Sequence, residues 1–233
     1  IWLGMGMTEK QGGSDVRANE TIATPVGAAG RGQPYLLTGH KWFFSAPMCD
    51  AHLVVAKTEQ DGLACFFVPR WREDGTKNNI HVQRLKDKVG NRSNSSSEVE
   101  FQEAWGIMIG EAGRGIPTII EMANYTRLTC VVGSSAMLRQ ALVQCIAYTR
   151  QRKAFGKPLA EQPLMQAVLA DLALETEAAV QLGFYLAQCY QLDTPLAQAW
   201  KRIMTPAAKF WVCKRTVELS GEMMEVFGGN GYV

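Results

Sequence analysis

The chain has 233 residues, of which 47% are hydrophobic and 20% are charged, and its formal net charge is +2. A chain of this size can bury one or two hydrophobic cores, and so small a charge does not by itself indicate a nucleic-acid-binding protein. The six cysteines form no CxxC pair and there are only three histidines, so we predict neither a metal site nor a redox pair. Scattered cysteines are typical of reduced, buried thiols, and we expect a cytoplasmic protein. No signal peptide and no apolar stretch of membrane-spanning length is evident, so we expect no membrane partner.

Residues 1–110 predict a β domain. Short runs rich in β-branched and aromatic residues cover 35–38, 52–56, 63–68 and 98–101. Segments rich in Gly, Pro, Asn and Asp separate these runs, and no helical period intervenes. An antiparallel barrel or sandwich is the fold that this pattern favours.

Residues 111–233 predict an antiparallel α-helical bundle, so the fold class is α+β. Apolar residues recur at helical spacing from 119 to 148, and a second helix begins at Pro163. Thr194 and Pro195 have the residue types of an N-cap and a first helical position. We expect Pro206 to kink or restart this third helix and Gly228-Gly229 to end it.

The segment richest in chemical information is Gly6-Met7-Thr8-Glu9-Lys10-Gln11-Gly12-Gly13-Ser14-Asp15. Its paired glycines allow positive φ and a close approach of the backbone to a ligand. Its hydroxyls can donate to ring carbonyls or phosphate oxygens, and successive amides in such a turn form an anion-binding concavity. The alternative interpretation is a polar surface turn.

This order of residues, Gly-Met-Thr-Glu-x-x-Gly-Gly-Ser-Asp-x-x-Ala, resembles the N-terminal motif of the flavin-dependent acyl-CoA dehydrogenases. Segments 39–45, 152–156 and 228–232 match further motifs of that family in the same order, so the resemblance covers essentially the whole chain. The wording of these motifs, with Gly90 to Asn94, is most similar to the AidB branch of the bacterial alkylation response. Family members have helices before and after this region, so we expect the chain to be part of a longer protein.

The resemblance implies an FAD site and a homotetramer, because the segment from Arg152 to Gly156 reaches the cofactor of a neighbouring subunit in that family. Phe43-Phe44-Ser45 stands where the family has Trp-Ile-Thr. This replacement still provides an aromatic wall, from Phe43, and a hydroxyl, from Ser45. The alternatives are a plain β-strand here and, for Arg152, a cation at a helix C-terminus. A glutamine that often follows the family motif is shifted by one, at Gln162. The implied cofactor-binding residues are Met5, Gly6, Met7, Thr8, Gly13, Ser14, Phe43, Phe44, Ser45, Arg152, Phe155, Gly228 and Gly229.

The same resemblance implies removal of a proton α to a thioester by a carboxylate base while the flavin takes a hydride. At the position where a minority of the family has Glu-Arg, this chain has Thr126-Arg127. The majority branch places its base after the glycine motif, so we expect no catalytic residue within this chain and a base beyond Val233. Arg127 is predicted either to line the acyl-CoA site or to be a surface cation. Glu9 is expected to accept local hydrogen bonds, and the histidines to be ordinary core or rim residues.

Charges alternate along the predicted helices: 122–160 carries only cations, 161–193 only acids, and 194–217 only cations. Antiparallel helices with opposite charge are expected to pair. The alternative is a basic face that meets the phosphates of double-stranded DNA. The leading hypothesis is therefore an FAD-dependent acyl-CoA dehydrogenase that passes electrons to a carrier. The alternative is an AidB-like flavoprotein that binds DNA and protects it from alkylation. A third possibility, a remnant of the fold that binds no flavin, disagrees with the intact motifs.

Overall fold

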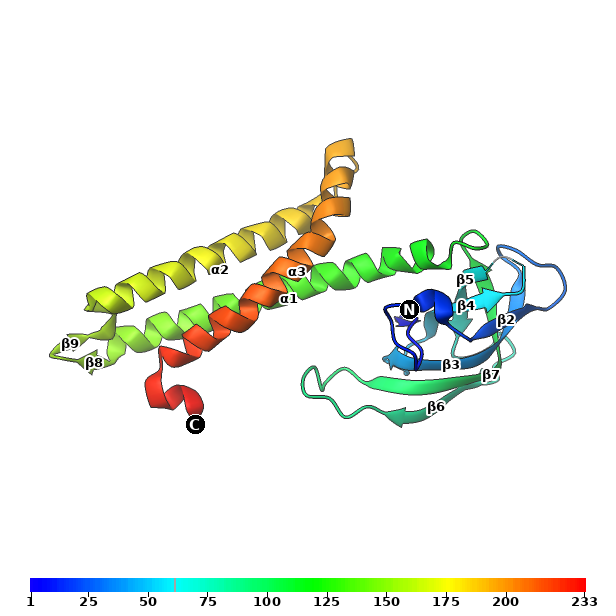
Figure 1. Cartoon of the computed structure of the whole chain (residues 1–233), viewed down its shortest axis with the longest axis horizontal. Helices are drawn as coiled ribbons and strands as arrows, with labels where there is room; N and C mark the ends of the chain where they lie inside the picture. Colours follow the sequence, from blue (N-terminus) through cyan, green and yellow to red (C-terminus); the bar gives the residue numbers. More distant parts are fainter. Residues whose placement is uncertain (61) are drawn as a thin grey trace. The chain divides into compact units, whose positions relative to one another are not determined.

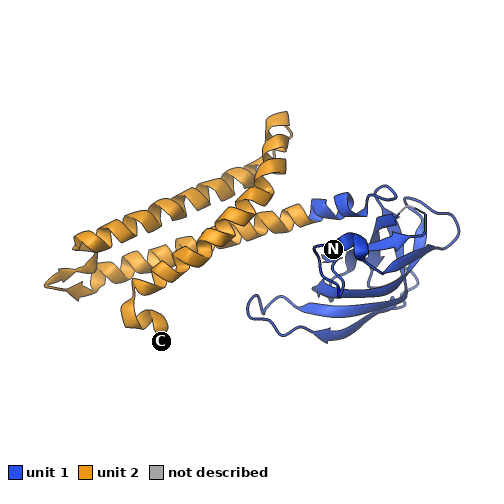
Figure 2. Ribbon diagram, in the orientation of Figure 1, with its two compact units in different colours: residues 1–122 blue, residues 123–233 orange. Residues whose placement is uncertain are grey.

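The computed structural model describes residues 1–60 and 62–233, and it divides into two compact units. Unit 1 comprises residues 1–122 and unit 2 comprises residues 123–233 (Figure 2). The mixed α+β class predicted from the sequence is confirmed, and each unit is described by itself below.

Unit 1 is a curled sheet of seven strands in the order β1-β3-β2-β4-β5-β7-β6 (Figure 1). Because β1 also pairs with β4, and β3 with β7, the sheet closes on itself as a barrel with β6 attached to β7. The prediction of a wholly antiparallel sheet is wrong at β1, which runs parallel to β4 with Leu3 opposite Ala51. The strands are β1 (Leu3–Gly6), β2 (Ile22–Pro25), β3 (Pro34–Ser45), β4 (Ala51–Thr58), β5 (Gly62–Pro69), β6 (Ile80–Leu85) and β7 (Ser96–Ile109), with a short helix η1 (Val16–Ala18).

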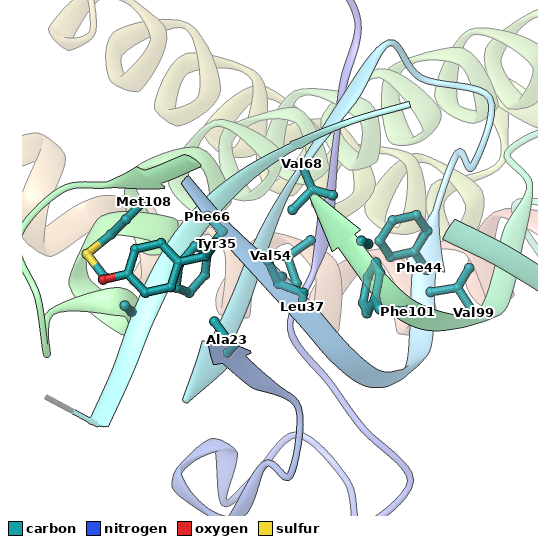
Figure 3. Packing of buried hydrophobic residues seen from close by; sticks show 13 residues of the cluster. Ala23, Tyr35, Leu37, Phe44, Val54, Phe66, Val68, Val99, Phe101 and Met108 are labelled. Carbon is teal, nitrogen blue, oxygen red and sulfur yellow. The ribbon is translucent and has the colours of Figure 1, made fainter. Parts of the chain in front are cut away.

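The barrel interior holds the main core of unit 1, and it is rich in aromatic side chains (Figure 3). The rings of Phe44 and Phe101 meet edge to face at 5.9 Å, and Tyr35 meets Phe66 in the same way at 5.1 Å. Inward-facing residues that alternate along the strands produce this packing, which is why the β-rich runs could be recognised in the sequence.

A buried histidine gives unit 1 a pH-dependent stability. His52 is 1% exposed and stacks on Phe44 at 4.0 Å, and its Nε2 lies 3.2 Å from the carbonyl oxygen of Ala46. Burial, opposed by that hydrogen bond and reinforced by the charge of Arg70, lowers the pKa of His52 to about 4. The folded protein therefore leaves this ring neutral between pH 6.5 and 4, where the unfolded chain protonates it.

We expect unit 1 to lose roughly 3 kcal/mol of stability from this one residue as the pH falls from 6.5 to 4. Urea denaturation at several pH values measures the slope. His52→Gln should flatten it, whereas His81→Gln, at an exposed position on β6, should leave it unchanged. An equal slope in the wild type and in His52→Gln would contradict the assignment.

Unit 2 contains three long helices with one shared core, and the antiparallel helical prediction agrees with it (Figure 1). Thr194 caps the third helix as predicted, because its side chain accepts a hydrogen bond from the amide of Ala197 at 3.2 Å. That helix continues through Pro206, so the expected restart does not occur. The elements are α1 (Gly115–Gln151, whose first turns belong to unit 1), β8 (Lys153–Ala154), β9 (Lys157–Pro158), η2 (Leu159–Glu161), α2 (Pro163–Cys189), α3 (Pro195–Glu225) and η3 (Gly228–Tyr232).

Opposite charges pair across two helices of unit 2, as the alternating charge pattern predicted. The guanidinium of Arg215 on α3 lies 2.8 Å from the carboxylate of Glu175 on α2. Both side chains are about one-third exposed, so solvent screens the attraction between them and the pair contributes little to stability.

Two statements drawn from composition are wrong: that no apolar stretch reaches membrane-spanning length, and that the thiols are all buried. Helix α1 is long and apolar enough to cross a membrane, by length and composition only, although the core helix of a soluble protein passes the same test. One thiol, that of Cys130, is exposed rather than buried.

Candidate functional site

The glycine-rich loop that follows β1 is tied down on β3. The carbonyl oxygen of Thr8 accepts a hydrogen bond from the amide of Trp42 at 2.9 Å, and that of Met7 accepts one from the Asn19 side chain at 2.7 Å. Within the loop the amide of Gly12, at φ +105°, donates to the carbonyl oxygen of Glu9. The loop therefore has a fixed shape before any ligand arrives.

Glu9 is the buried anchor of this loop. Its Oε1 lies 2.6 Å from the Nζ of Lys41 and accepts a 2.6 Å hydrogen bond from the hydroxyl of Thr21, and its Oε2 accepts one from the amide of Glu20. The side chains of Glu9 and Lys41 are both fully buried. A carboxylate held in this way accepts hydrogen bonds and touches no open surface, which agrees with the local role expected from the sequence.

Both partners of this pair are charged at neutral pH. Burial raises the pKa of Glu9, but the Lys41 ammonium and the hydrogen bonds from Thr21 and Glu20 outweigh it and keep the pKa below its usual range. Burial lowers the pKa of Lys41 to about 8, although the Glu9 carboxylate opposes this. The pair joins the first two of the motifs that carry the resemblance, because Glu9 belongs to the first motif and Lys41 to the second.

The loop presents unpaired donors to its surface. Within the part of the chain that the structure describes, the amides of Gly13 and Ser14 and the Ser14 hydroxyl have no hydrogen-bond partner, and both residues are exposed. A Cβ at Gly13 would lie 3.0 Å from the Thr8 hydroxyl, so a side chain there would crowd that group. Free amides next to a hydroxyl fit an anionic group such as a diphosphate.

The predicted aromatic wall lies in an irregular part of β3. The pairing register between β3 and β7 shifts between Lys41 and Phe44, and bulges of this kind re-aim side chains next to sites. The rings of Trp42 and Phe43 lie 3.9 Å and 4.5 Å from the Nζ of Lys86, which also pairs with Glu98. The sequence interpretation missed this contact, because it depends on a bulge.

The structure brings together the first two motifs but not every side chain predicted in them. Gly6 lies directly opposite Phe44 across β1 and β3, with exposed Phe43 and Ser45 on either side of Phe44. The Phe44 side chain is fully buried in the barrel core, so the predicted contact of this ring with a cofactor is not available and only its backbone remains. Met5 and Met7 are half-buried against a small cluster that includes Val55.

In unit 2 the Arg152 motif forms a tight hairpin of β8 and β9. Phe155 at its tip is 98% exposed and has φ +54°, and Gly156 follows at φ +83°. Arg152 is exposed, and in the described residues it has no ion pair. Gln162 braces the turn through a 3.0 Å hydrogen bond to the carbonyl oxygen of Ala154. A fully exposed phenyl group on a strained backbone is typical of a segment that contacts another molecule.

The glycine motif of unit 2 forms η3, and a cavity of about 480 Å³ opens beside it. Asn230 and Phe227 line this cavity together with Gln140 and Gln144 of α1. Gly228 has φ +60°, and a Cβ at either Gly228 or Gly229 would meet open space. Amide and apolar side chains that meet in one cavity are suited to a planar ring with polar edges.

Arg127 is half-buried on α1 and donates to the Asn124 side chain at 3.0 Å. This contact lies within the helix itself, and it is compatible with either of the two roles predicted for the arginine.

Family models match both units. The model of the acyl-CoA dehydrogenase C-terminal domain matches residues 113–233, and that of the middle domain matches residues 4–104. The chain belongs to the acyl-CoA dehydrogenase family. Members of this family share the barrel and the helices described above: butyryl-CoA dehydrogenase from Megasphaera elsdenii superposes with a TM-score of 0.81 at 26% identity over 99% of this chain and 59% of that one.

Among curated relatives, AidB of Escherichia coli (strain K12) is 51% identical over all 233 residues, which cover 42% of its own length. Acyl-CoA dehydrogenase family member 11 of Caenorhabditis elegans is 31% identical over 99% of this chain and 39% of its length. The structure of ACDH-11 of that organism in complex with C11-CoA superposes with a TM-score of 0.90 over 100% of this chain and 41% of that one. The chain thus spans about two-fifths of the length of these relatives.

Proposed function

We propose that this chain supplies most of the FAD site of an acyl-CoA dehydrogenase-type flavoprotein that oxidises an acyl-CoA at the α,β carbon–carbon bond. The observation that carries the proposal is the loop anchored by Glu9, which offers the free amides of Gly13 and Ser14 beside the Thr8 hydroxyl. One of the solved structures named above is a complex with C11-CoA and another is a butyryl-CoA dehydrogenase, which supports this substrate class.

Different residues of unit 1 would bind different parts of the cofactor. The amides of Gly13 and Ser14 would bind the diphosphate, and the hydroxyls of Thr8 and Ser45 would donate to the ring system. FAD, when bound, supplies the electron acceptor for the oxidation. We place the catalytic base outside the chain, because the family resemblance puts it after the glycine motif and because Glu9 is buried in an ion pair.

Replacing Thr8 and Ser14 together with alanine is expected to weaken flavin retention at least tenfold. The Ser14 hydroxyl beside the diphosphate and the Thr8 hydroxyl at the ring are both lost, and a hydrogen bond to a charged group alone contributes about 1.5–3 kcal/mol. Flavin-to-protein ratio after gel filtration is the measurement. The double variant Thr24→Ala with Ser93→Ala, at exposed positions outside the motif, is the matched control. Unchanged flavin stoichiometry in the first variant would count against the site.

We further propose that the protein is a homotetramer in which the β8–β9 hairpin reaches a neighbouring subunit. Arg152→Glu is expected to lower both flavin content and the tetramer fraction, because the guanidinium would no longer neutralise a diphosphate. Analytical ultracentrifugation gives the assembly state, and Lys157→Glu on the same hairpin controls for the change of charge. A flavin-saturated tetramer of Arg152→Glu would refute this role.

An AidB-like role in protecting DNA from alkylation, with weak dehydrogenase activity, is the second candidate. The identity of 51% with AidB favours it, as do the cations on α1 and α3. The two candidates share a flavin but differ in whether an acyl-CoA reduces it, and that difference decides between them.

A further inference from the structure

Another cavity, of about 270 Å³, lies in unit 1 and outside the motifs discussed so far. It is lined by the turn between β5 and β6, by the start of β6, and by Pro47 from the turn after β3. We call it the Arg70 cavity, and its lining residues are Pro47, Arg70, Trp71, Lys77, Asn78, Ile80 and Val82.

Arg70 contributes an unsatisfied donor to this region. Its Nε is buried and has no hydrogen-bond partner, and in residues 1–60 and 62–233 no carboxylate lies within 4.0 Å of its guanidinium. Buried polar groups in proteins are nearly always hydrogen-bonded, so an orphaned guanidinium nitrogen beside a cavity needs an explanation. An acceptor that enters the cavity provides one.

The other walls suit an anion with an apolar body. Lys77 adds a second cation, and the lining residues include no carboxylate. Trp71 is 52% exposed and its backbone bridges to that of Lys77, so the ring and the ammonium are carried side by side. The Asn78 side chain already bonds Pro69, Asn79 and Trp105, and it therefore stiffens the wall instead of recruiting a ligand.

The charge of Arg70 also acts on its buried neighbours. After burial, which is the largest cause, it adds to the lowering of the pKa of His52, and it opposes the rise in the pKa of Cys49 that burial and Asp50 produce. The positive charge of Arg70 therefore reaches His52, whereas at Cys49 the carboxylate of Asp50 outweighs it.

We propose that the Arg70 cavity binds a small organic anion, with its phosphate or carboxylate held by Arg70 and Lys77 and its apolar body against Trp71. The guanidinium fork suits both oxyanions, because it can make two parallel charge-assisted hydrogen bonds. The proposal does not depend on the flavin, since none of the lining residues belongs to the predicted cofactor site.

Isothermal titration calorimetry of the full-length, flavin-loaded protein tests this, with phenyl phosphate, benzoate and inorganic phosphate as probes and benzyl alcohol as the neutral probe. We expect saturable binding of the aromatic anions at one site per chain and none of benzyl alcohol. Arg70→Gln should weaken binding about tenfold to a hundredfold, and Arg31→Gln, an exposed cation of the same unit, should not. Trp71→Ala should weaken the binding of phenyl phosphate more than the binding of inorganic phosphate.

Arg70→Lys separates a binding role from a structural one, because it keeps the charge and loses the fork. Partial loss of affinity with an unchanged melting temperature supports the assignment. Absence of saturable binding, or equal affinity in wild type and Arg70→Gln, would overturn it and leave a water molecule as the partner of Nε. Anaerobic bleaching of the flavin by acyl-CoA is scored separately, so failure of this site and failure of the proposed function are distinguishable.

Discussion

Replacing Glu9 with glutamine is expected to destabilise unit 1 by about 3–5 kcal/mol, because it leaves the buried Lys41 ammonium without a counter-ion. The same change removes the anchor of the glycine loop, so flavin content should fall with stability. Urea denaturation followed by far-UV circular dichroism measures the first effect, and the flavin-to-protein ratio measures the second.

Removing both charges tests whether the loss comes from the orphaned lysine. The double variant Glu9→Gln with Lys41→Met should recover most of the lost stability, because no buried charge remains without a partner. Glu20→Gln, an exposed neighbour, should stay within about 0.5 kcal/mol of the wild type. A loss below 1 kcal/mol in Glu9→Gln, or no recovery in the double variant, would show that this pair does not hold the loop.

Replacing Gly39 with alanine is the second large effect, with an expected loss of about 2–5 kcal/mol. Gly39 has φ +147°, and a Cβ there would lie 2.6 Å from both the Cα and the Oγ1 of Thr21. Backbone strain and overpacking each cost about 1–3 kcal/mol. Because Thr21 donates to Glu9, the clash also loosens the loop anchor.

Gly27→Ala provides a control at another glycine with a positive φ. Gly27 has φ +102° but open space around it, so alanine there should lose only the strain, about 1 kcal/mol. Thermal denaturation of the two variants side by side separates the cost of backbone strain from the cost of the steric clash with Thr21. Equal losses in both would mean that the close approach of Gly39 to Thr21 contributes nothing.

Much of this architecture could be predicted from local patterns. The long strands and all three helices follow hydrophobic period, Pro163 and the Thr194 cap, each of which acts within a few residues. Strands β1, β2 and β6 were not predicted, because the first two are four residues long and β6 is exposed along most of its length. The parallel pairing of β1 with β4 depends on barrel closure, which no local sequence pattern predicts.

The site divides in the same way. The motif residues Thr8, Ser14 and Ser45 could be named in advance because a family pattern marks them. The burial of the Phe44 ring and the contact of Lys86 with Phe43 could not, because a bulge in β3 determines which side chains point inward. The Glu9–Lys41 pair could have been predicted, since the two residues have opposite charges and belong to two motifs that form one site in the resembled family.

The central claim is that this chain carries the flavin site of an acyl-CoA-oxidising protein, and an anaerobic titration of the full-length, flavin-loaded protein tests it most directly. A panel of acyl-CoAs of different chain length and branching is added while the flavin absorbance is followed. Our account predicts that one class of acyl-CoA bleaches the flavin absorbance rapidly and stoichiometrically. The variant with both Thr8→Ala and Ser14→Ala should retain too little flavin for this bleaching to be measured. A flavin that binds but stays oxidised with every member of the panel would contradict the dehydrogenase assignment and favour the DNA-protecting candidate.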